Sequence, residues 1–585
     1  MPTPARAHRN LIRHPMSLQQ TDIALGSPRF FDDLSADPNA NFSPKLNADM
    51  GALPQWRQLV QLHGPAGAAA HVKGDFAVGL QLAPGEAYGA VDRFASQTLC
   101  YRQDGNTLRF AAQANELADG QTAGTADLDP QALFDYLYFH VVPSPRTVFK
   151  GVHRLPPGRY VHLKDGKLTV APYWVPTFSQ PAKPIFADLR EEFRQLLQAA
   201  VKRQLDGSKV ACYLSGGTDS STVTGMAGLA TGAAASAYSI GFHSEGYDEM
   251  AYARLAAKHF GAEHHEYYVT PDDLVRSIGE VAAAYDQPFG NSSALPGFIC
   301  AQQARSQGVT RILAGDGGDE LFGGNSRYAM QEIFGWYQQV PGLLRKGLME
   351  PFFGMDWVGR TPLLKKGTGY IRQANTPLPE RLQAFNLVRR LGYGEVLTPG
   401  FLAQVRPGQV AAEQARVWAE ARSNNEIDEH LAYDWRYTLA ESDLPKVRGT
   451  SALAGLQVGF PMLDDDLLAF SMRLPSQYKL NRLRLRWFFK EALRGFLPDE
   501  ILSKKKQGFS LPFGHWALRH DALRALASDS VRSFGTRGVV QPRFIDDLLE
   551  THLPAAPHYY GTMVWILMMA EQWMRVHAPD WRLQS

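Results

Sequence analysis

The chain has 585 residues, with 60 basic and 58 acidic side chains and a formal net charge of +2. This balance argues against an extended electrostatic surface for nucleic acid. Its three cysteines form no CxxC pair, which excludes a zinc knuckle or redox motif of that type and fits a reducing compartment. No apolar run reaches the roughly eighteen residues that a membrane-spanning helix needs. We therefore expect a cytoplasmic globular protein that binds neither nucleic acid nor membrane.

The first part of the chain predicts a mostly antiparallel domain over residues 1–175. Residues 1–60 have weak periodicity and many Pro, Asn, Asp and Ser residues, which indicates irregular or extended structure. Apolar stretches broken by glycine-containing turns follow, and these are typical of strands. The expected elements are strands at Val72–Leu82, Tyr88–Val91, Val148–Leu155 and Arg159–Leu163, and a short helix at Leu128–Tyr138.

A proline-rich linker over residues 172–184 precedes a second domain, residues 176–585. Strands and helices alternate there, and this order predicts a doubly wound parallel sheet with helices on both faces. Beyond about residue 327 the chain is predicted to be mainly helical. The expected elements are helices at 189–205, 220–229, 249–260 and 563–574, and strands at 210–214, 237–242, 264–269 and 311–314.

A glycine- and serine-rich loop, Leu214–Ser221, joins a predicted strand to a predicted helix. Its two glycines, Gly216 and Gly217, permit close backbone approach, and backbone N–H groups at a helix N-terminus bind anions. Asp219 would repel a phosphate unless it holds Mg²⁺ that the phosphates share. A plain helix-capping turn is the alternative, but the strand–loop–helix context favours a phosphate site. No lysine follows the glycines, so this loop differs from GxxxxGK[ST].

A second loop follows another predicted strand and reads Ala314-Gly315-Asp316-Gly317-Gly318-Asp319-Glu320. Three carboxylates in five residues repel one another unless a cation or a proton intervenes. Both loops end parallel strands, where open α/β sheets bind ligands. We therefore expect Mg²⁺ to be shared by Asp219 and Asp319; a solvated acidic turn is the alternative.

These motifs resemble the asparagine synthetase family, within the wider group of PP-loop ATP pyrophosphatases. Residues 213–221 resemble its pyrophosphate loop and residues 314–324 its second signature. The similarity continues through Lys446-Val447, the segment 460–464 and the segment 506–509. Residues 65–175 are similar to the family's glutaminase-type domain, which has an Ntn-hydrolase-like fold. The resemblance covers most of the chain.

The resemblance implies an ATP-dependent ligase that activates a carboxylate as an acyl-adenylate, releases pyrophosphate and forms an amide with an amine, as in asparagine biosynthesis. Lys506 would neutralise the departing pyrophosphate, although it is one of three consecutive lysines that could lie on a solvated face. Asp316 would face the acyl substrate. The implied cofactors are ATP and Mg²⁺, and a homodimer is an open alternative. The implied ATP-binding residues are Leu214, Ser215, Gly216, Gly217, Asp219, Ser220, Ile240, Ala314, Gly315 and Asp319.

The chain departs from the family's pattern at two places. The family's glutaminase half uses a cysteine at position 2, whereas this chain begins Met1-Pro2-Thr3-Pro4, so we expect a degenerate glutaminase-type domain. Around the family's acyl site, Arg448 replaces an acidic residue, and Gln457 and Gly459 replace an acid–base pair. Such changes alter local charge and should move the substrate preference. The carboxylate is therefore left open, and so is the amine donor, ammonia or a substrate amine.

Three alternatives follow from the same residues. The altered acyl side is also compatible with β-lactam synthetases or lasso-peptide macrolactam synthetases, in which amine and carboxylate lie in one molecule. A PP-loop tRNA-modifying enzyme would need a basic face. The main basic cluster, Arg482, Arg484, Arg486 and Lys490, alternates with apolar residues, which is more typical of a solvated face of an amphipathic segment. A non-catalytic scaffold is the third alternative, although both loops are intact.

Overall fold

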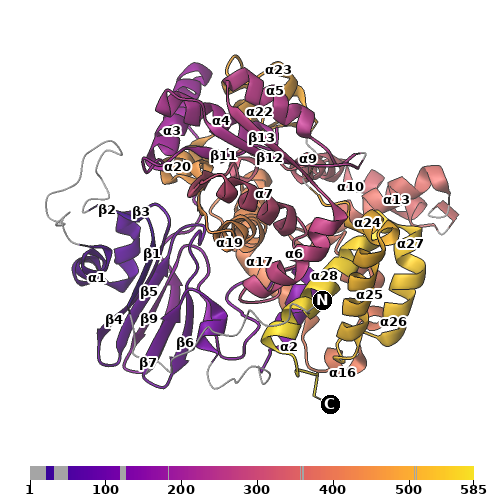
Figure 1. The fold of residues 1–585 in the computed structure, drawn as a ribbon. Coiled ribbons are helices and arrows are strands. Elements are labelled where there is room, and N and C mark those ends of the chain that lie inside the picture. The colour runs from indigo at the N-terminus through magenta and orange to yellow at the C-terminus, as the bar shows by residue number, and fades with distance from the viewer. Residues whose placement is uncertain are drawn as a thin grey trace, which may run out of the picture.

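The computed structural model shows an antiparallel sheet beside a larger part that holds a parallel sheet and most of the helices (Figure 1). This arrangement confirms the predicted mixed α/β class. The structure describes residues 22–31, 51–118, 127–181, 184–244, 246–355, 357–358, 361–505, 508 and 510–584.

The N-terminal sheet has five antiparallel strands in the order β1-β4-β5-β9-β10. Alternate residues of β4 serve two cores, because successive side chains of a strand point to opposite faces. Phe76 and Val78 pack with Trp56 of the helix α1, whereas Ala77 packs with Leu108 of β7 on the other face. The elements are β1 (Ile23–Gly26), α1 (Ala52–Ala68), β4 (Phe76–Ala83), β5 (Glu86–Val91), β6 (Cys100–Asp104), β7 (Thr107–Ala111), β9 (Arg159–Lys164) and β10 (Lys167–Pro172).

Three local predictions in this part were wrong. The helix α1 lies where irregular structure was expected, and its buried Trp56 and Leu59 show that tertiary packing stabilises it despite weak periodicity. The strand expected from Val72 is divided into β3 (Val72–Lys73) and β4, because Gly74 adopts a left-handed φ of 89° between them. Only β8 (His153–Arg154) forms within 148–155. The helix expected near Leu128 is α2 (Pro130–Phe139), which Asp129 caps.

The second sheet is parallel throughout and has the order β13-β12-β11-β14-β15. Helices cover both faces, as predicted: in β12, Ala237 packs with α5, whereas its neighbour Tyr238 packs with α7. The elements are β11 (Ala211–Tyr213), α4 (Thr218–Thr231), β12 (Ser236–Phe242), α5 (Met250–Phe260), β13 (Glu263–Val269), α7 (Ala294–Ser306), β14 (Arg311–Leu313) and β15 (Gln457–Gly459).

The strand order reverses at the centre of this sheet. From β11 the chain proceeds to β12 and β13 on one side, and then returns to β14 on the other side. The loops that leave β11 and β14 are therefore neighbours at the carboxyl edge of the sheet, at the kind of position where open α/β sheets bind their ligands.

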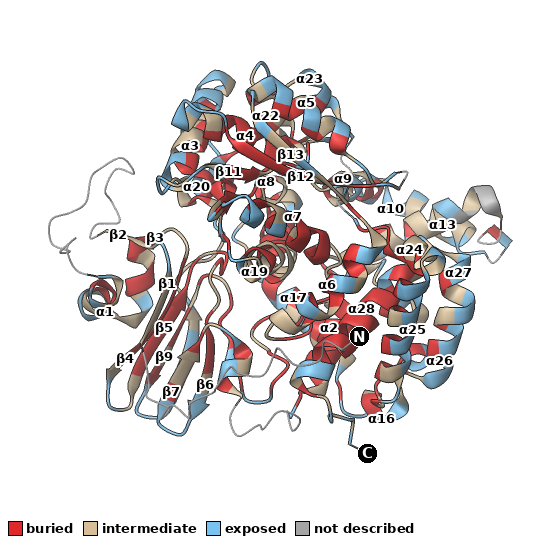
Figure 2. Ribbon diagram, in the orientation of Figure 1, coloured by how far each residue is buried: buried red, intermediate tan, exposed pale blue. Residues whose placement is uncertain are grey.

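The rest of the chain is mainly helical, as predicted (Figure 1). The helix α28 (Pro557–His577) extends beyond the predicted 563–574 on both sides, and its side chains lie in the largest apolar core. Figure 2 shows it as a predominantly buried helix among its neighbours. In the described parts of the chain, no helix combines the length and apolar character needed to cross a bilayer.

Further helices surround this core and the parallel sheet. They include α3 (Phe186–Arg203), α6 (Pro271–Ala284), α8 (Gly318–Phe322), α9 (Ser326–Gln338), α13 (Pro362–Asn375), α17 (Pro407–Glu420), α18 (Glu426–Asp434), α19 (Leu444–Leu453), α20 (Asp465–Arg473), α21 (Ser476–Lys479), α22 (Trp487–Ala492), α24 (Phe513–Arg519) and α25 (Asp521–Gly535). A small antiparallel hairpin, β16 (Leu480–Asn481) and β17 (Arg484–Leu485), precedes α22.

The two sheets belong to parts of the chain that make direct polar contacts. The guanidinium of Arg93 donates to Asp465 at 2.6 Å, and the Lys73 ammonium lies 2.8 Å from Asp466. Arg448 donates to the carbonyl of Ser96 at 3.1 Å. The predicted boundary between residues 175 and 176 stays a prediction.

A fully buried ion pair ties the linker to the helices. The Lys479 ammonium donates to Asp428 at 2.7 Å, both side chains have 0% exposure, and Gln180 of the linker donates to the same carboxylate. Replacing Lys479 with Met leaves a buried carboxylate without its counter-charge, which should lower the free energy of unfolding by about 3–5 kcal/mol in urea denaturation.

The control is Arg524→Met, which breaks the exposed pair with Asp521 and should change the free energy of unfolding very little. Equal effects of the two substitutions would contradict a stabilising role for the Lys479–Asp428 pair.

Candidate active site

The first loop, between β11 and α4, is closed by its own hydroxyl groups. The Ser220 hydroxyl accepts from the backbone N–H of Ser215 at 3.2 Å and lies 3.0 Å from the Ser215 hydroxyl. Gly216 has a left-handed φ of 73°, and a Cβ there would lie 2.4 Å from the backbone nitrogen of Ala253 in α5. Only glycine fits this position without displacing α5. The loop therefore presents its backbone at the start of α4.

The second loop, between β14 and α8, packs directly on the first. A Cβ on Gly315 would lie 2.7 Å from the backbone nitrogen of Ser220, and a Cβ on Gly318 would lie 2.3 Å from Oδ1 of Asp219. Gly317 has a left-handed φ of 103°, which turns the chain into α8. The glycines thus allow the two loops to touch, and the predicted meeting of the loops at one edge of the sheet is what the geometry shows.

Asp219 of the first loop and Asp319 of the second face the same guanidinium. Nη1 of Arg486 lies 2.6 Å from Oδ2 of Asp219 and 2.7 Å from Oδ1 of Asp319. Burial opposes the charge of Arg486, but the two carboxylates raise its pKa above the ordinary value. The prediction that Arg486 lies on a solvated face was wrong, because the turn after β17 gives it a left-handed φ of 53° and directs it inward.

A cavity of about 590 Å³ lies over the two loops. Nine of the predicted site residues line it, whereas two do not: Gly216 packs against α5, and Ala314 is buried with its N–H bonded to Gly459. Lys506 lies outside the described residues. The nine are Leu214, Ser215, Gly217, Asp219, Ser220, Ile240, Gly315, Asp316 and Asp319.

An acid–base cluster lies at the Asp316 side of the cavity. The Lys446 ammonium is 2.9 Å from Asp443 and 3.9 Å from Asp316. Burial raises the pKa of Asp316 to about 6, against the opposing effect of the Lys446 charge. Burial opposes the charge of Lys446, but Asp443 and Asp316 raise its pKa above the ordinary value. This end of the cavity therefore holds a fixed cation beside a carboxyl that titrates near neutral pH.

Several lining residues were not predicted as site residues. Lys446 was recognised only as part of a motif, and its spacing from Asp443 on one helical turn was the available signal. Lys504 pairs with Glu249 at 2.6 Å within the cavity wall, so it does not lie on a solvated face. Arg486 had no signal in the sequence, because the left-handed turn that directs it is not encoded by glycine or asparagine.

The three departures from the family's acyl pattern do not line this cavity. Arg448, Gln457 and Gly459 line a second cavity of about 1070 Å³, which also has walls from the N-terminal part. Arg448 donates to the hydroxyl of Thr98 at 3.0 Å, across the contact between the two sheets' domains. These residues therefore alter the region between the domains, not the wall around the two loops.

The residues present fit a magnesium-bound nucleotide. Mg²⁺ is usually held by one or two carboxylates together with substrate phosphates, and Asp219 and Asp319 supply two carboxylates that lie close together at one guanidinium nitrogen. The start of the fourteen-residue helix α4 and the glycine-bearing backbone supply donors suited to phosphate. The cavity volume is within the range typical of small-molecule sites.

Comparison with known proteins agrees with this geometry. Residues 192–575 match the family model described as asparagine synthase, and residues 58–174 match the model of a glutamine amidotransferase domain. The chain therefore belongs to the asparagine synthase family.

Individual relatives are distant. Asparagine synthetase [glutamine-hydrolyzing] 1 of Bacillus subtilis is 24% identical over 80% of this chain and 71% of its own length. A putative asparagine synthetase of Mycobacterium bovis is 26% identical over 76% of this chain and 67% of its own length. Amidase chry2 of Gibberella zeae is 24% identical over 63% of this chain and 60% of its own length.

The contact between Gly318 and Asp219 gives a steric test of the site. Gly318→Ala places a Cβ where Asp219 Oδ1 now lies, so the carboxylate must move away from Asp319. Affinity for ATP in the presence of Mg²⁺, measured by calorimetry, should fall by roughly tenfold or more, as expected for loss of a charged contact.

Gly335→Ala in α9 is the matched control, because a Cβ there meets no atom within 4 Å. It should leave the affinity unchanged. Unaltered ATP affinity in Gly318→Ala, with its fold intact, would contradict the importance of the contact between the loops.

The raised pKa of Asp316 predicts a pH-dependent effect on stability. Because its folded pKa of about 6 exceeds the ordinary value of 3.8, the fold favours the protonated form, and this contribution is present below pH 4 and lost between pH 4 and 6. Asp316→Asn mimics the protonated form. It should match the wild type at pH 4 and be more stable at pH 7, by about 1–3 kcal/mol in urea unfolding.

A stability difference between Asp316→Asn and the wild type that does not change from pH 4 to pH 7 would show that this carboxyl is not perturbed.

Proposed function

We propose that the chain is an ATP-dependent ligase that activates a carboxylate as an acyl-adenylate, releases pyrophosphate and then forms an amide. The observation that carries this proposal is the pair of glycine-bearing loops that line one cavity, where Asp219 and Asp319 lie within 2.7 Å of the same guanidinium nitrogen of Arg486. Membership of the asparagine synthase family supports a ligase that forms C–N bonds. Relatives named as asparagine synthetases support the same class of reaction.

In this proposal residues of both loops bind ATP. Leu214 and Ile240 flank the adenine and ribose, and Gly315 contacts the nucleotide through its backbone. Asp219 and Asp319 hold Mg²⁺, which when bound neutralises charge on the phosphates. Three residues of the first loop would contact the phosphates through N–H and hydroxyl groups: Ser215, Gly217 and Ser220. Gly216, which does not line the cavity, would act through the shape that it gives the loop.

Positive charge around the cavity would stabilise the departing pyrophosphate. Arg486 is fixed beside both carboxylates, and Lys504 lies in the wall of the same cavity. Lys506 is proposed as the lysine of this step on its place in the motif alone. Asp316 and Lys446 would face the reacting carboxylate and amine, because they form a polar cluster in the wall of the same cavity.

The amine donor is either ammonia or an amine of the substrate. We propose that this chain does not generate ammonia from glutamine, because each of its three cysteines is buried. Burial raises the pKa of the Cys212 and Cys300 thiols to about 12, and it also raises that of Cys100, so none forms a thiolate readily. A β-lactam or macrolactam synthetase, in which one molecule carries amine and carboxylate, fits this condition equally.

The purified chain, incubated with glutamine and ATP, should release no glutamate above the rate of a buffer control, as measured by an enzyme-coupled glutamate assay. Glutamate release that is abolished by thiol alkylation would contradict the proposal that the N-terminal domain is inactive.

Exchange of labelled pyrophosphate into ATP tests the adenylation step without an amine. We expect exchange only when the right carboxylate is added, from pools of amino acids or peptides. Asp219→Ala should reduce exchange by at least about a hundredfold, since it removes a charged group expected to act in the transition state, and it should leave the fold intact.

Asp521→Ala, at an exposed position in the first turn of α25, is the control and should exchange at the wild-type rate. Near-normal exchange in Asp219→Ala would refute the magnesium assignment. Salt-sensitive tRNA binding would favour a tRNA-modifying enzyme, and failure to bind ATP would favour a scaffold.

A further inference from the structure

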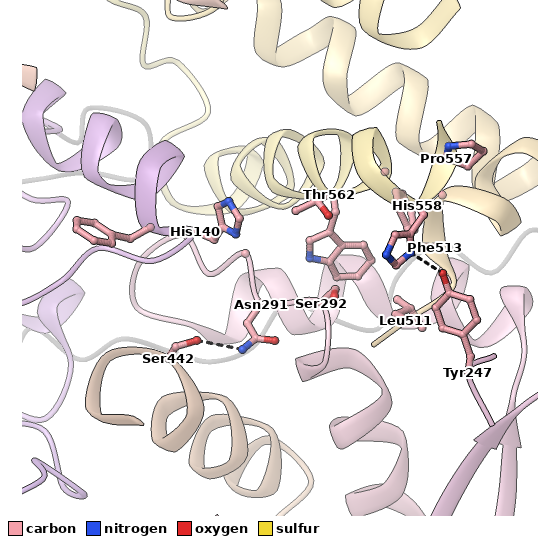
Figure 3. A pocket seen from close by; sticks show the side chains of 15 residues that line it. His140, Tyr247, Asn291, Ser292, Ser442, Leu511, Phe513, Pro557, His558 and Thr562 are labelled. Carbon is pink, nitrogen blue, oxygen red and sulfur yellow. Dashed lines mark hydrogen bonds between the residues drawn. The ribbon is translucent and has the colours of Figure 1, made fainter. Parts of the chain in front are cut away.

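A third, smaller pocket of about 200 Å³ (Figure 3) lies beside the cavity of the two loops. It is built where the first turns of α28, the end of α2, the segment 290–292 and the segment 511–514 meet. In Figure 3, His140 and His558 lie at opposite ends of the pocket, with Thr562 between them. None of the expected site residues lines it.

The pocket shares a wall with the active-site cavity. Tyr247 and Asn291 line both spaces. Along the chain, Ser292 lines the pocket whereas Ser293 lines the cavity, and Ser442 lines the pocket whereas its neighbour Asp443 lines the cavity. The Asn291 amide donates to the Ser442 hydroxyl at 3.0 Å and so joins the two segments (Figure 3). The two spaces are therefore adjacent, and a molecule that reacts in the cavity would lie next to this pocket.

The pocket lining carries no Asp, Glu, Lys or Arg among its fifteen described residues. Burial lowers the pKa of His140 to about 4, so this ring is neutral at pH 7. His558 is hydrogen bonded through Nδ1 to the Tyr247 hydroxyl at 2.9 Å. Burying an ionised group without a counter-charge is strongly unfavourable. The pocket is consequently suited to an uncharged group and unsuited to the charged ends of an amino acid such as aspartate.

One polar group in the lining is left without a partner. Trp565 is 1% exposed and lines the pocket, and its indole N–H has no acceptor among the residues that the structure describes. A buried donor without an acceptor is unfavourable by about 1–3 kcal/mol. A ligand that supplies an acceptor would remove this penalty. Phe513 packs edge-on against the same indole, with ring centroids 5.0 Å apart, and gives the pocket an aromatic wall.

The shape of the pocket is fixed by close backbone contacts. A Cβ on Gly514 would lie 1.9 Å from the carbonyl oxygen of Pro557, and a Cβ on Gly561 would lie 2.8 Å from Cα of Gly514. The segment 511–514 is thereby held against the first turns of α28. A dry cavity of about 150 Å³ accommodates benzene. A volume of about 200 Å³ therefore accommodates one aromatic ring with a small polar substituent.

We propose that this side pocket binds an uncharged group of about one ring, carrying a hydrogen-bond acceptor, that belongs to a substrate reacting in the neighbouring cavity. The assignment of the bound group to a substrate rests on the proposed ligase function. Binding of a small uncharged ligand to the pocket does not depend on that function. A pocket of this kind favours a carboxylate substrate larger than aspartate, or an amine substrate larger than ammonia.

Benzamide is a suitable probe, because it joins one ring to a neutral carbonyl acceptor. Its binding to the full chain is measured by calorimetry without ATP, and we expect Trp565→Phe to weaken it about fivefold, the value of one neutral hydrogen bond. Trp573→Phe is the matched control on the same helix: it loses a hydrogen bond to the Tyr285 carbonyl but does not line the pocket. It should not alter the affinity.

A second variant addresses the case in which Trp565→Phe does not fold. Thr562 is exposed at the rim of the pocket, so Thr562→Phe should fold normally and weaken benzamide binding at least tenfold by filling the space. Benzoate and benzamidine, which are charged, should bind at least tenfold more weakly than benzamide. Absence of benzamide binding, or equal binding to wild type and Thr562→Phe, would overturn the proposal.

Inhibition kinetics decide which of the two substrates carries the ring. Competitive inhibition of ATP–pyrophosphate exchange by benzamide assigns the ring to the carboxylate substrate, whereas inhibition of amide formation alone assigns it to the amine substrate. Inhibition of neither reaction would overturn the link between pocket and cavity. If no carboxylate supports exchange, the ligase proposal fails. The benzamide measurement still decides whether the pocket binds an uncharged ring.

Discussion

The site depends on the close approach of two backbone loops at the centre of the parallel sheet. Gly315 and Gly318 have no side chains, and their backbone therefore reaches the start of α4 and the carboxylate of Asp219. This contact brings two carboxylates to one nitrogen, Nη1 of the Arg486 guanidinium. Carboxylates at such short range repel each other unless a positive charge lies between them. The fold thus brings two negative charges to one point, where the Arg486 guanidinium supplies the compensating positive charge.

The parallel sheet and both loops could be predicted from the sequence because their signals are local. Short apolar strands, the paired glycines and the acidic loop each lie within about ten residues, and the parallel direction of the strands follows from their alternation with helices. The strand β15 was not among the expected strands. The sequence also predicted that the loops would meet, since both leave the carboxyl edge of one sheet.

Other features depend on contacts between distant segments and could not be predicted in this way. Arg486 alternates with apolar residues as a solvated face would, but the β16–β17 hairpin and a left-handed turn bury it beside Asp219, which is 267 positions away. The helix α1 has little periodicity of its own and forms through packing of Trp56 under the antiparallel sheet. The side pocket joins six segments from separate parts of the chain.

The departures from the family's pattern lie mainly between the domains. Arg448 donates to Ser96 and Thr98 of the N-terminal part, and Gln457 and Gly459 line the same space. The cavity over the two loops keeps its carboxylates and lysines. Changes at these three residues therefore alter the space between the domains and leave the lining of the cavity over the two loops unchanged.

Hydrogen–deuterium exchange tests most directly whether the two loops form one nucleotide site. The chain is compared with and without Mg²⁺ and α,β-methylene-ATP, which binds as ATP does but resists cleavage between its α- and β-phosphates. If both loops hold one nucleotide, amide exchange slows in residues 215–220 and 315–319 together, over the same range of ligand concentration. Protection of only one loop, or of neither, would contradict a shared site for magnesium and ATP.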